Sequence, residues 1–265
     1  MNVNINKSRL AINKLNKIKT PILCLTAYTA PIARIVDKYA NIILVGDSLG
    51  PVLYGYKSTR DVTIEMMIKH ASAVVKNSKR SLVVVDMPFG TYEKSKNQAF
   101  KNAQKILSES GASAVKLEGG ESIFETVRYL TKKKIKVMGH IGMLPQSLDG
   151  VYKVYGRKKK EKDQLMRDLR FLEEAGVFSI VIECTLESLV NKILHKATVP
   201  IIGIGASSKC DGQIIVTEDL LGLTDFSSKF LKKYANIKQI IDQSIQKFFL
   251  DVNQKKYPKK KHCYK

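Results

Sequence analysis

The sequence predicts an α/β fold, a closed (β/α)8 barrel of the TIM type framed by an extra N-terminal helix and a C-terminal helix. Three observations lead to this prediction. The 265 residues match the roughly 250 residues that one such barrel needs. Eight short apolar segments alternate with segments of helical spacing, which is typical of a parallel sheet with right-handed crossovers. Four of the apolar segments end in a carboxylate, and in a barrel such ends meet at one mouth.

The predicted strands are short, rich in Val, Ile and Leu, and bounded by polar or glycine-containing turns. They lie near residues 22–28, 41–47, 81–86, 114–118, 135–140, 178–183, 200–204 and 213–216. The interval between the last two is shorter than a full crossover usually needs, so the eighth strand is the weakest of these assignments.

The predicted helices carry apolar residues at three- and four-residue spacing. They cover residues 63–78, 97–110, 121–133, 161–175 and 185–195. Gly111 and Gly176 follow two of them directly, where glycine supplies the left-handed residue that ends a helix. A helix near 7–18 is expected to close the bottom of the barrel. Another near 236–254 has an apolar face that needs a partner, either the barrel or another subunit.

No long linker and no repeat of fixed period interrupts the chain, so residues 1–265 are predicted to form a single domain.

The net charge of +21 raises the possibility of a nucleic-acid partner. However, only 8 of the 45 basic residues are arginine, and the only dense basic cluster is the tail at about 255–265. Charge spread in this way indicates solvated helix surfaces, so no nucleic-acid partner is expected.

The four cysteines, Cys24, Cys184, Cys210 and Cys263, are far apart and include no C-x-x-C pair. This spacing does not favour a zinc cluster or a disulfide framework, and reduced thiols suit a cytoplasmic protein. The N-terminus lacks the apolar run of a signal peptide, and no segment approaches the roughly 20 apolar residues of a membrane span. We therefore expect a cytoplasmic protein without a membrane partner.

Asp47 and Asp86 end two neighbouring predicted strands. Gly46 and Gly50 allow the first loop to turn sharply against a ligand. An aspartate after a strand often caps the next helix, which is the alternative for either residue alone. Converging acids repel each other unless a cation or a shared proton offsets the repulsion. The pair therefore predicts a divalent metal site, and oxygen-only ligands favour magnesium over zinc.

Lys116 and Glu118 are two residues apart in one predicted strand, so both side chains point to the same side. Facing the barrel mouth, Lys116 offers a cation for a substrate carboxylate and Glu118 offers an acid for the metal. The alternative is a surface ion pair.

Glu183 ends a strand on the opposite part of the wall, a position that suits a base acting across the substrate. For Glu183 the alternatives are a helix cap or a buried ion pair. His140 is expected to be structural more often than substrate-binding.

Several strings lie between about residues 21 and 223, namely LTAY, ILVGDSLG, GY-ST--VT---MI-H, VVVDMPFGTY, AVKLEGG, GHIGMLPQS, IVIEC, IGIGAS, CDGQIIV and DLLGL. Together these strings resemble the ketopantoate hydroxymethyltransferase family. The chain departs from the family pattern at Thr29, Leu144, Ser207 and 217–219, none of which is a metal or base position.

The resemblance implies residue roles at the matching positions. Asp47 and Asp86 correspond to magnesium ligands, and Glu118 corresponds to the third acidic position at the metal. Ser48 and Lys116, together with both aspartates, correspond to residues that bind the oxo-acid. Glu183 corresponds to the catalytic proton acceptor.

The resemblance also implies the reaction and the assembly. A hydroxymethyl group would pass from 5,10-methylenetetrahydrofolate to 3-methyl-2-oxobutanoate through a magnesium-stabilised enolate, giving 2-dehydropantoate for pantothenate and coenzyme A synthesis. A homo-oligomer, a decamer in this family, is implied as well. Two alternatives stay open: a folate-independent, metal-dependent oxo-acid lyase or mutase of the same barrel superfamily, and a nucleic-acid-binding protein on a repurposed barrel.

Overall fold

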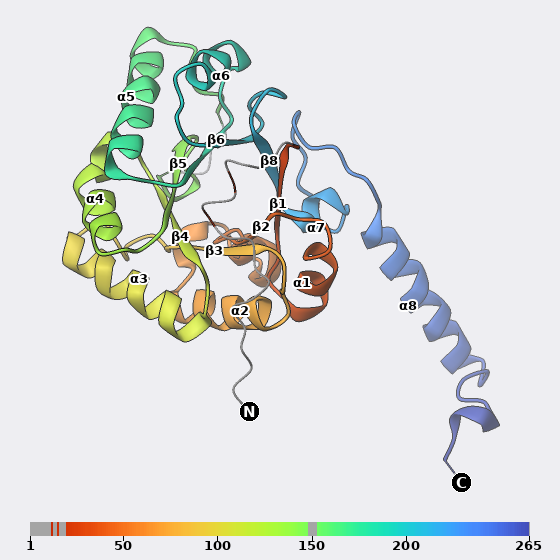
Figure 1. The fold of residues 1–265 in the computed structure, drawn as a ribbon. Helices are drawn as coiled ribbons and strands as arrows, with labels where there is room; N and C mark the ends of the chain where they lie inside the picture. The colour runs from red at the N-terminus through yellow and green to blue at the C-terminus, as the bar shows by residue number, and fades with distance from the viewer. Residues whose placement is uncertain (1–11, 13–14, 16–19, 148–152, 265) are drawn as a thin grey trace. The chain divides into compact units, whose positions relative to one another are not determined.

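A computed structural model of the chain describes residues 12, 15, 20–147 and 153–264. The residues form two compact units, 1–216 and 217–265. The first contains a closed barrel in which eight parallel strands pair in chain order, from β1 with β2 through to β8 with β1 (Figure 1). The predicted (β/α)8 fold is confirmed. The single-domain boundary at 1–265 stays a prediction.

All eight strands lie at the predicted places, with ends that differ by two residues or fewer. They are β1 (Ile22–Thr26), β2 (Ile42–Val45), β3 (Leu82–Asp86), β4 (Ala114–Glu118), β5 (Val137–Gly142), β6 (Ser179–Glu183), β7 (Ile201–Ile204) and β8 (Gly212–Ile215). The predicted helices are also present. They are α2 (Ile64–Lys76), α3 (Lys96–Ser110), α4 (Phe124–Lys132), α5 (Lys159–Ala175) and α6 (Glu187–Leu194), and they surround the strands (Figure 1).

The helix ends follow the local sequence signals. Ser95 accepts a hydrogen bond from the backbone N–H of Gln98 and begins α3. Gly111 and Gly176 end α3 and α5 with φ of 73° and 85°, as predicted.

Smaller elements that the sequence analysis did not predict lie in the connections between the main ones. They are α1 (Ala30–Val36), a π-helical turn η3 (Gly50–Tyr54), and the 3₁₀ turns η4 (Thr59–Asp61), η5 (Glu121–Ile123) and η6 (Pro145–Ser147). The helix predicted near 7–18 lies largely outside the described residues, which include only Ile12 and Leu15 of that range.

The connection from β7 to β8 contains no helix, which explains the short interval in the sequence. Residues 205–211 cross directly, and the Asp211 carboxylate accepts a hydrogen bond of 2.8 Å from the Ile201 backbone N–H. Gly212 lies so close to β1 that a Cβ atom there would be 2.4 Å from the Ile22 carbonyl oxygen. Glycine at this position therefore allows the last strand to close the barrel.

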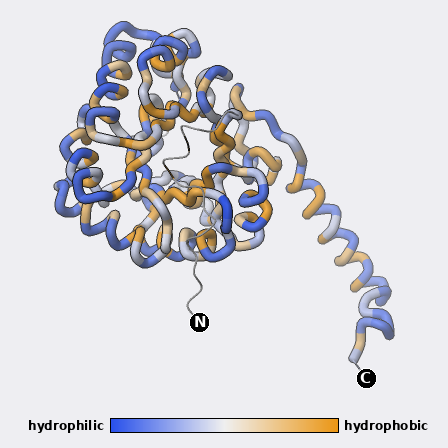
Figure 2. The backbone as a smooth tube through the Cα atoms, viewed as in Figure 1, coloured by the Kyte–Doolittle hydropathy of each residue, from blue (hydrophilic) through white to orange (hydrophobic). Residues whose placement is uncertain are grey.

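Two apolar layers result from the alternation of side chains along the strands. Ile22, Ile42, Leu82, Val84 and Ile202 belong to the cluster inside the barrel. Neighbouring residues such as Ile43 and Val83 belong to the larger cluster between strands and helices. Figure 2 shows the strands mostly in the hydrophobic colour, while the surrounding helices alternate between the two colours.

The second unit contains α7 (Thr217–Leu220), the predicted C-terminal helix α8 (Ile237–Asn253) and the turn η7 (Lys260–His262). Within this unit the side chain of Lys238 pairs with Asp225 at 2.6 Å. Ile241, Ile245, Phe248 and Val252 recur at three- and four-residue spacing along α8 and are exposed. In the described part of the chain, no helix is long and apolar enough to cross a membrane.

Asp37, after α1, fixes the start of the strand that carries Asp86. Its carboxylate accepts hydrogen bonds from the backbone N–H groups of residues 79, 80 and 81, at 2.8, 3.0 and 2.8 Å, directly before β3. Burial opposes ionisation of this carboxyl group, but these hydrogen bonds leave its pKa below the usual value.

We predict that Asp37→Ala lowers the free energy of unfolding by about 1.5–3 kcal/mol, because three backbone N–H groups, including the buried one of Ser81, lose a charged acceptor. Urea denaturation followed by circular dichroism measures the change. Asp61→Ala, at an exposed aspartate, is the control and should stay within about 0.5 kcal/mol of the parent chain. Equal stabilities of the two variants would contradict the role given to Asp37.

Candidate active site at the carboxyl ends of the strands

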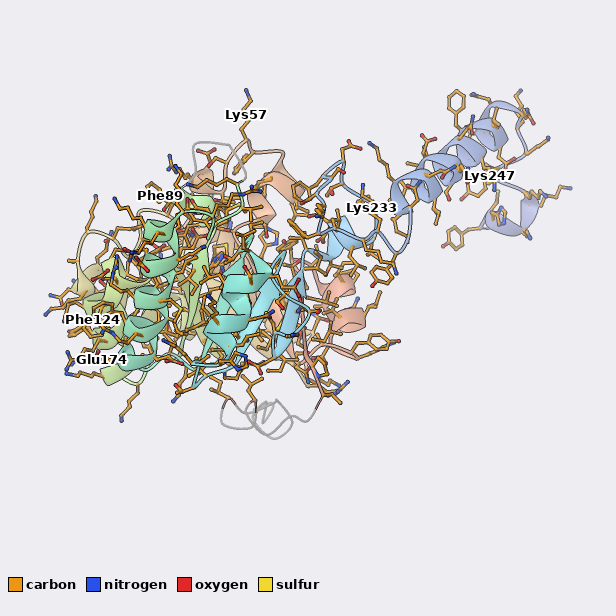
Figure 3. All side chains as sticks on the ribbon, turned by 90° about the horizontal axis from the view of Figure 1, so that it is seen from above. Lys57, Phe89, Phe124, Glu174, Lys233 and Lys247 are labelled. Atoms are coloured by element: carbon orange, nitrogen blue, oxygen red, sulfur yellow. The ribbon has the colours of Figure 1, made fainter. Side chains whose placement is uncertain are left out.

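A charged layer covers the apolar interior of the barrel where the strands end. Asp86 ends β3, Lys116 and Glu118 lie on β4, His140 on β5, and Glu183 ends β6. In the sheet register Asp86 pairs with Lys116, and Glu118 pairs with His140. Figure 3 shows Lys57 and Phe89, from the segments that follow β2 and β3, at the same end of the barrel. The predicted convergence of the acids at one mouth is therefore observed.

Asp47 and Asp86 are neighbours, although they are 39 residues apart in the chain. The backbone N–H of Asp47 donates a hydrogen bond of 3.2 Å to Asp86 Oδ2. Both side chains are buried. Burial, followed by the repulsion of Asp86, raises the pKa of Asp47 to about 7.

Lys116 brings a positive charge into this layer. Its Nζ atom lies 2.9 Å from Asp86 Oδ1 and 3.3 Å from His140 Nδ1. Burial alone would lower the pKa of the ammonium, but the charges of Asp86, Glu118 and Asp47 raise it. Lys116 is therefore a buried cation among acids, and the alternative of a surface ion pair is wrong.

His140 lies between the lysine and two glutamates. Its Nδ1 atom is 3.6 Å from Glu118 Oε1, and its Nε2 atom is 3.2 Å from Glu183 Oε2. Burial and the nearby charge of Lys116 hold the pKa of this imidazole well below its usual value, so it is neutral. An Nδ1 atom that accepts a hydrogen from Lys116 leaves the ring proton on Nε2, facing Glu183.

Glu183 and Glu118 occupy different surroundings. Burial raises the pKa of Glu183 to about 7, although the charge of Lys116 opposes the shift. Burial, followed by the charge of Asp47, raises the pKa of Glu118 well above the usual value. Glu118 also accepts a hydrogen bond of 3.0 Å from the backbone N–H of Gln146, whereas Glu183 faces only the neutral His140 among these groups.

Ser48 and two residues without a predicted role complete the described surroundings. The Ser48 hydroxyl lies 2.8 Å from the hydroxyl of Tyr28. Gln146 and Tyr92 are buried beside the acids, and the Gln146 amide donates a hydrogen bond to Asp47. Gln146 lies shortly after the predicted strand end at His140 and within the string GHIGMLPQS, which were the sequence signals for it.

The residues present fit a magnesium ion held by few protein ligands. Within the described ranges, no group of three His, Cys, Asp or Glu side chains is close enough to hold a metal by itself. Magnesium keeps several waters and is commonly held by one or two carboxylates, so the Asp47–Asp86 pair suffices. Among the described atoms, Asp86 Oδ1 is buried without a well-aligned hydrogen bond, despite its contact with Lys116. The excess of acids over Lys116 also favours a bound cation.

The comparisons with known proteins agree with one family over nearly the whole chain. The family model for ketopantoate hydroxymethyltransferase matches residues 7–260. A 3-methyl-2-oxobutanoate hydroxymethyltransferase of Rhodospirillum rubrum is 48% identical over 247 residues, covering 92% of this chain and 89% of the relative. The protein of the same name in Pelagibacter ubique is 48% identical over 260 residues, covering 98% of this chain and 100% of the relative.

Solved structures of lower identity share the fold. A 2,3-dimethylmalate lyase, a member of the PEP mutase/isocitrate lyase superfamily, is 13% identical with a TM-score of 0.63, covering 91% of this chain and 86% of that one. Phosphoenolpyruvate phosphomutase from Streptomyces platensis is 13% identical with a TM-score of 0.62, covering 92% and 86%.

We predict that Lys116→Met destabilises the protein most above pH 7. The variant removes a buried ammonium from ionised carboxylates, and breaking a buried pair in this way costs about 3–5 kcal/mol. At pH 5.5 Asp47 and Glu183, whose pKa values are about 7, are largely protonated, so the loss should shrink. Urea unfolding in the presence of EDTA at pH 8 and pH 5.5 measures both values.

Lys105→Met is the matched control, because Lys105 pairs with Glu65 on the surface at the same 2.9 Å. Its effect on stability should be much smaller than that of Lys116→Met at either pH. A Lys116→Met cost that is the same at both pH values would contradict the assigned charge compensation.

Proposed function

The chain belongs to the ketopantoate hydroxymethyltransferase family, and from that premise we propose that it transfers a hydroxymethyl group from 5,10-methylenetetrahydrofolate to 3-methyl-2-oxobutanoate, giving 2-dehydropantoate. It is an enzyme, a one-carbon transferase. The observation that carries the proposed chemistry is the layer of Asp47, Asp86 and Glu118 around the buried Lys116, with Glu183 beside the neutral His140.

Lys116 and Ser48 are the proposed binding groups for the oxo-acid. An ammonium in this layer attracts a substrate carboxylate, and a charge-assisted hydrogen bond of this kind is worth about 1.5–3 kcal/mol. Tyr28 holds the Ser48 hydroxyl at 2.8 Å, which limits its rotation before substrate binds.

Asp47 and Asp86 are the proposed magnesium ligands, with Glu118 as the third acidic position at the metal. When bound there, the ion would polarise the oxo-acid and make the C3 proton more acidic. Asp47 and Asp86 thereby also contribute to substrate binding.

Glu183 is the proposed catalytic base that removes the proton from C3 of the oxo-acid. A carboxyl group with a pKa of about 7 is well matched to proton transfer near neutral pH. His140 Nε2 lies 3.2 Å from Glu183 Oε2, so the imidazole touches the proposed base, although the contact is not aligned as a hydrogen bond. The resulting C3 carbanion forms a bond to the methylene carbon of the folate, the methylene–nitrogen bonds break, and water supplies the hydroxyl group and the balancing proton.

The location, partners and assembly of the protein are proposed from the family to which the chain belongs. A pantothenate-pathway enzyme of this kind would act in the cytoplasm on small molecules, without a nucleic-acid or membrane partner. The exposed apolar face of α8, which includes Ile245 and Phe248, supports a homo-oligomer, and the family resemblance suggests a decamer.

The alternative enzyme is a folate-independent lyase or mutase of oxo-acids, which shares the barrel but not the one-carbon donor. We predict that the purified protein forms 2-dehydropantoate only when oxo-acid, methylenetetrahydrofolate and magnesium are all present. Product analysis by mass spectrometry with each component omitted in turn measures this dependence. Cleavage or rearrangement of an oxo-acid without folate would favour the alternative, as would the absence of any hydroxymethylated product.

We also predict that Glu183→Gln loses C3 proton exchange while still binding the oxo-acid. Gln keeps the shape of the side chain but does not accept the proton, and a positioned base contributes about 100–10,000-fold in rate. The measurement is deuterium uptake at C3 in heavy water with magnesium and no folate. Wild-type exchange should rise with pH through about 7 and then level off, because Glu183 acts as a base only when ionised.

The control is Glu187→Gln, an exposed acid on the helix after β6. Its exchange rate should match that of the parent chain. Unchanged exchange in Glu183→Gln would assign the base to another group at the mouth.

A further inference from the structure

Gln146, on the turn η6 after β5, joins the proposed ligands to each other. The residue is 2% exposed. Its side-chain Nε2 group donates to Asp47 Oδ2 at 2.8 Å and to the Met87 carbonyl oxygen at 3.0 Å, which uses both of its hydrogens. Its Oε1 atom accepts a hydrogen bond of 2.6 Å from the Tyr92 hydroxyl.

The main chain of Gln146 also makes two hydrogen bonds. Its N–H donates to Glu118 Oε2 at 3.0 Å, and its carbonyl oxygen accepts from Arg60 Nε at 2.7 Å. The Arg60 guanidinium itself stacks over the Phe89 ring, 5.0 Å from the ring centroid. One buried residue therefore binds one oxygen of Asp47 and one oxygen of Glu118, and both its side chain and its main chain are held in place.

Tyr92 determines which end of the amide meets Asp47. A phenol at neutral pH has a proton to donate. The side-chain oxygen Oε1 of Gln146, at 2.6 Å, is the nearer of the two acceptors of Tyr92, because the main-chain carbonyl oxygen of Glu118 is 3.3 Å away. With Oε1 directed at Tyr92, the NH₂ group is the end that faces the carboxylate. The opposite orientation would place an amide oxygen against Asp47.

We propose that Gln146, oriented by Tyr92, is a positioning residue that holds Asp47 and Glu118 in the arrangement that binds the divalent cation. The proposal rests on the proposed metal-dependent function. A neutral amide supplies hydrogen bonds without adding positive charge, whereas Lys116 neutralises part of the negative charge. Gln146 can therefore fix the carboxylates and leave their charge available to a cation. Partners that orient metal ligands in this way commonly affect metal affinity by about 10–100-fold.

The experiment titrates the metal-free, full-length protein with Mn²⁺ as the probe, by calorimetry and by electron paramagnetic resonance. Gln146→Leu has a similar side-chain volume and loses only the amide contacts, so Mn²⁺ affinity should fall about 10–100-fold. Tyr92→Phe keeps the ring and frees the amide to turn, so affinity should fall about threefold to tenfold. The resonance spectrum of bound Mn²⁺ should also change in both variants, because its ligands are held less symmetrically.

Two further variants give the upper and lower limits of the Mn²⁺ affinity expected in this experiment. Gln98→Leu is the matched control, because its amide donates a hydrogen bond to the Gly90 carbonyl oxygen on the surface, away from the acids. It should bind Mn²⁺ as the parent chain does. Asp86→Asn changes a proposed ligand directly and should lose most of the affinity.

The outcomes separate this proposal from the function on which it rests. Wild-type affinity and spectrum in both Gln146→Leu and Tyr92→Phe, with binding lost in Asp86→Asn, would overturn the role of Gln146 and leave the metal site intact. No Mn²⁺ binding by the parent chain would overturn the metal site itself and the proposal with it.

A third measurement distinguishes positioning from general damage to the fold. Saturating Mn²⁺ should restore C3 proton exchange in Gln146→Leu to within about threefold of the parent rate, since the base is untouched. If Gln146→Leu is too unstable to assay, Tyr92→Phe carries the test alone. Failure of saturating metal to restore exchange in Tyr92→Phe would also count against the proposal.

Discussion

Charge compensation at the mouth of the barrel is the constraint on which the rest of the site depends. Among the residues that the structure describes, the charges of Asp47, Asp86, Glu118 and Glu183 act on one buried ammonium, that of Lys116. With all four acids ionised, such a layer carries a net charge of −3, which low-dielectric surroundings do not tolerate without a cation or protons. Burial and the repulsion of Asp86 raise the pKa of Asp47 to about 7, and burial raises that of Glu183 to about 7. The layer is consequently suited to a divalent ion and an anionic substrate.

The alternation of inward- and outward-pointing side chains along the barrel strands produces this charged layer. Residues that point inward on neighbouring strands are apolar near the strand starts, as at Leu82 and Ala114, and charged at the strand ends, as at Asp86 and Glu118. The apolar layers exclude water beneath the charges and strengthen their interactions. The Asp37 carboxylate, bound to the three N–H groups before β3, fixes the strand that carries Asp86.

Chemically similar acids acquire different roles from their neighbours. Asp47 and Glu118 each accept a hydrogen bond from Gln146, so they are held in fixed orientations. Glu183 faces the Nε2 of a neutral imidazole, at 3.2 Å, and its carboxylate is not engaged by Gln146 or Lys116 in any hydrogen bond described for them. This difference supports ligand roles for the first two and a proton-transfer role for Glu183.

Sequence alone determined the barrel, its eight strands and the carboxylates at their ends, because alternating periodicity and strand-end position are local properties of the chain. It also identified Lys116 and Glu118 as a pair on one face, since two-residue spacing fixes that relation in any strand. The hydrogen bond from the Asp47 N–H to Asp86, the neutral state of His140 and the contacts of Gln146 were decided by the tertiary structure. Gln146 and Asp47 are 99 residues apart and meet only after the barrel closes, and the protonation of His140 depends on burial and charges from other strands.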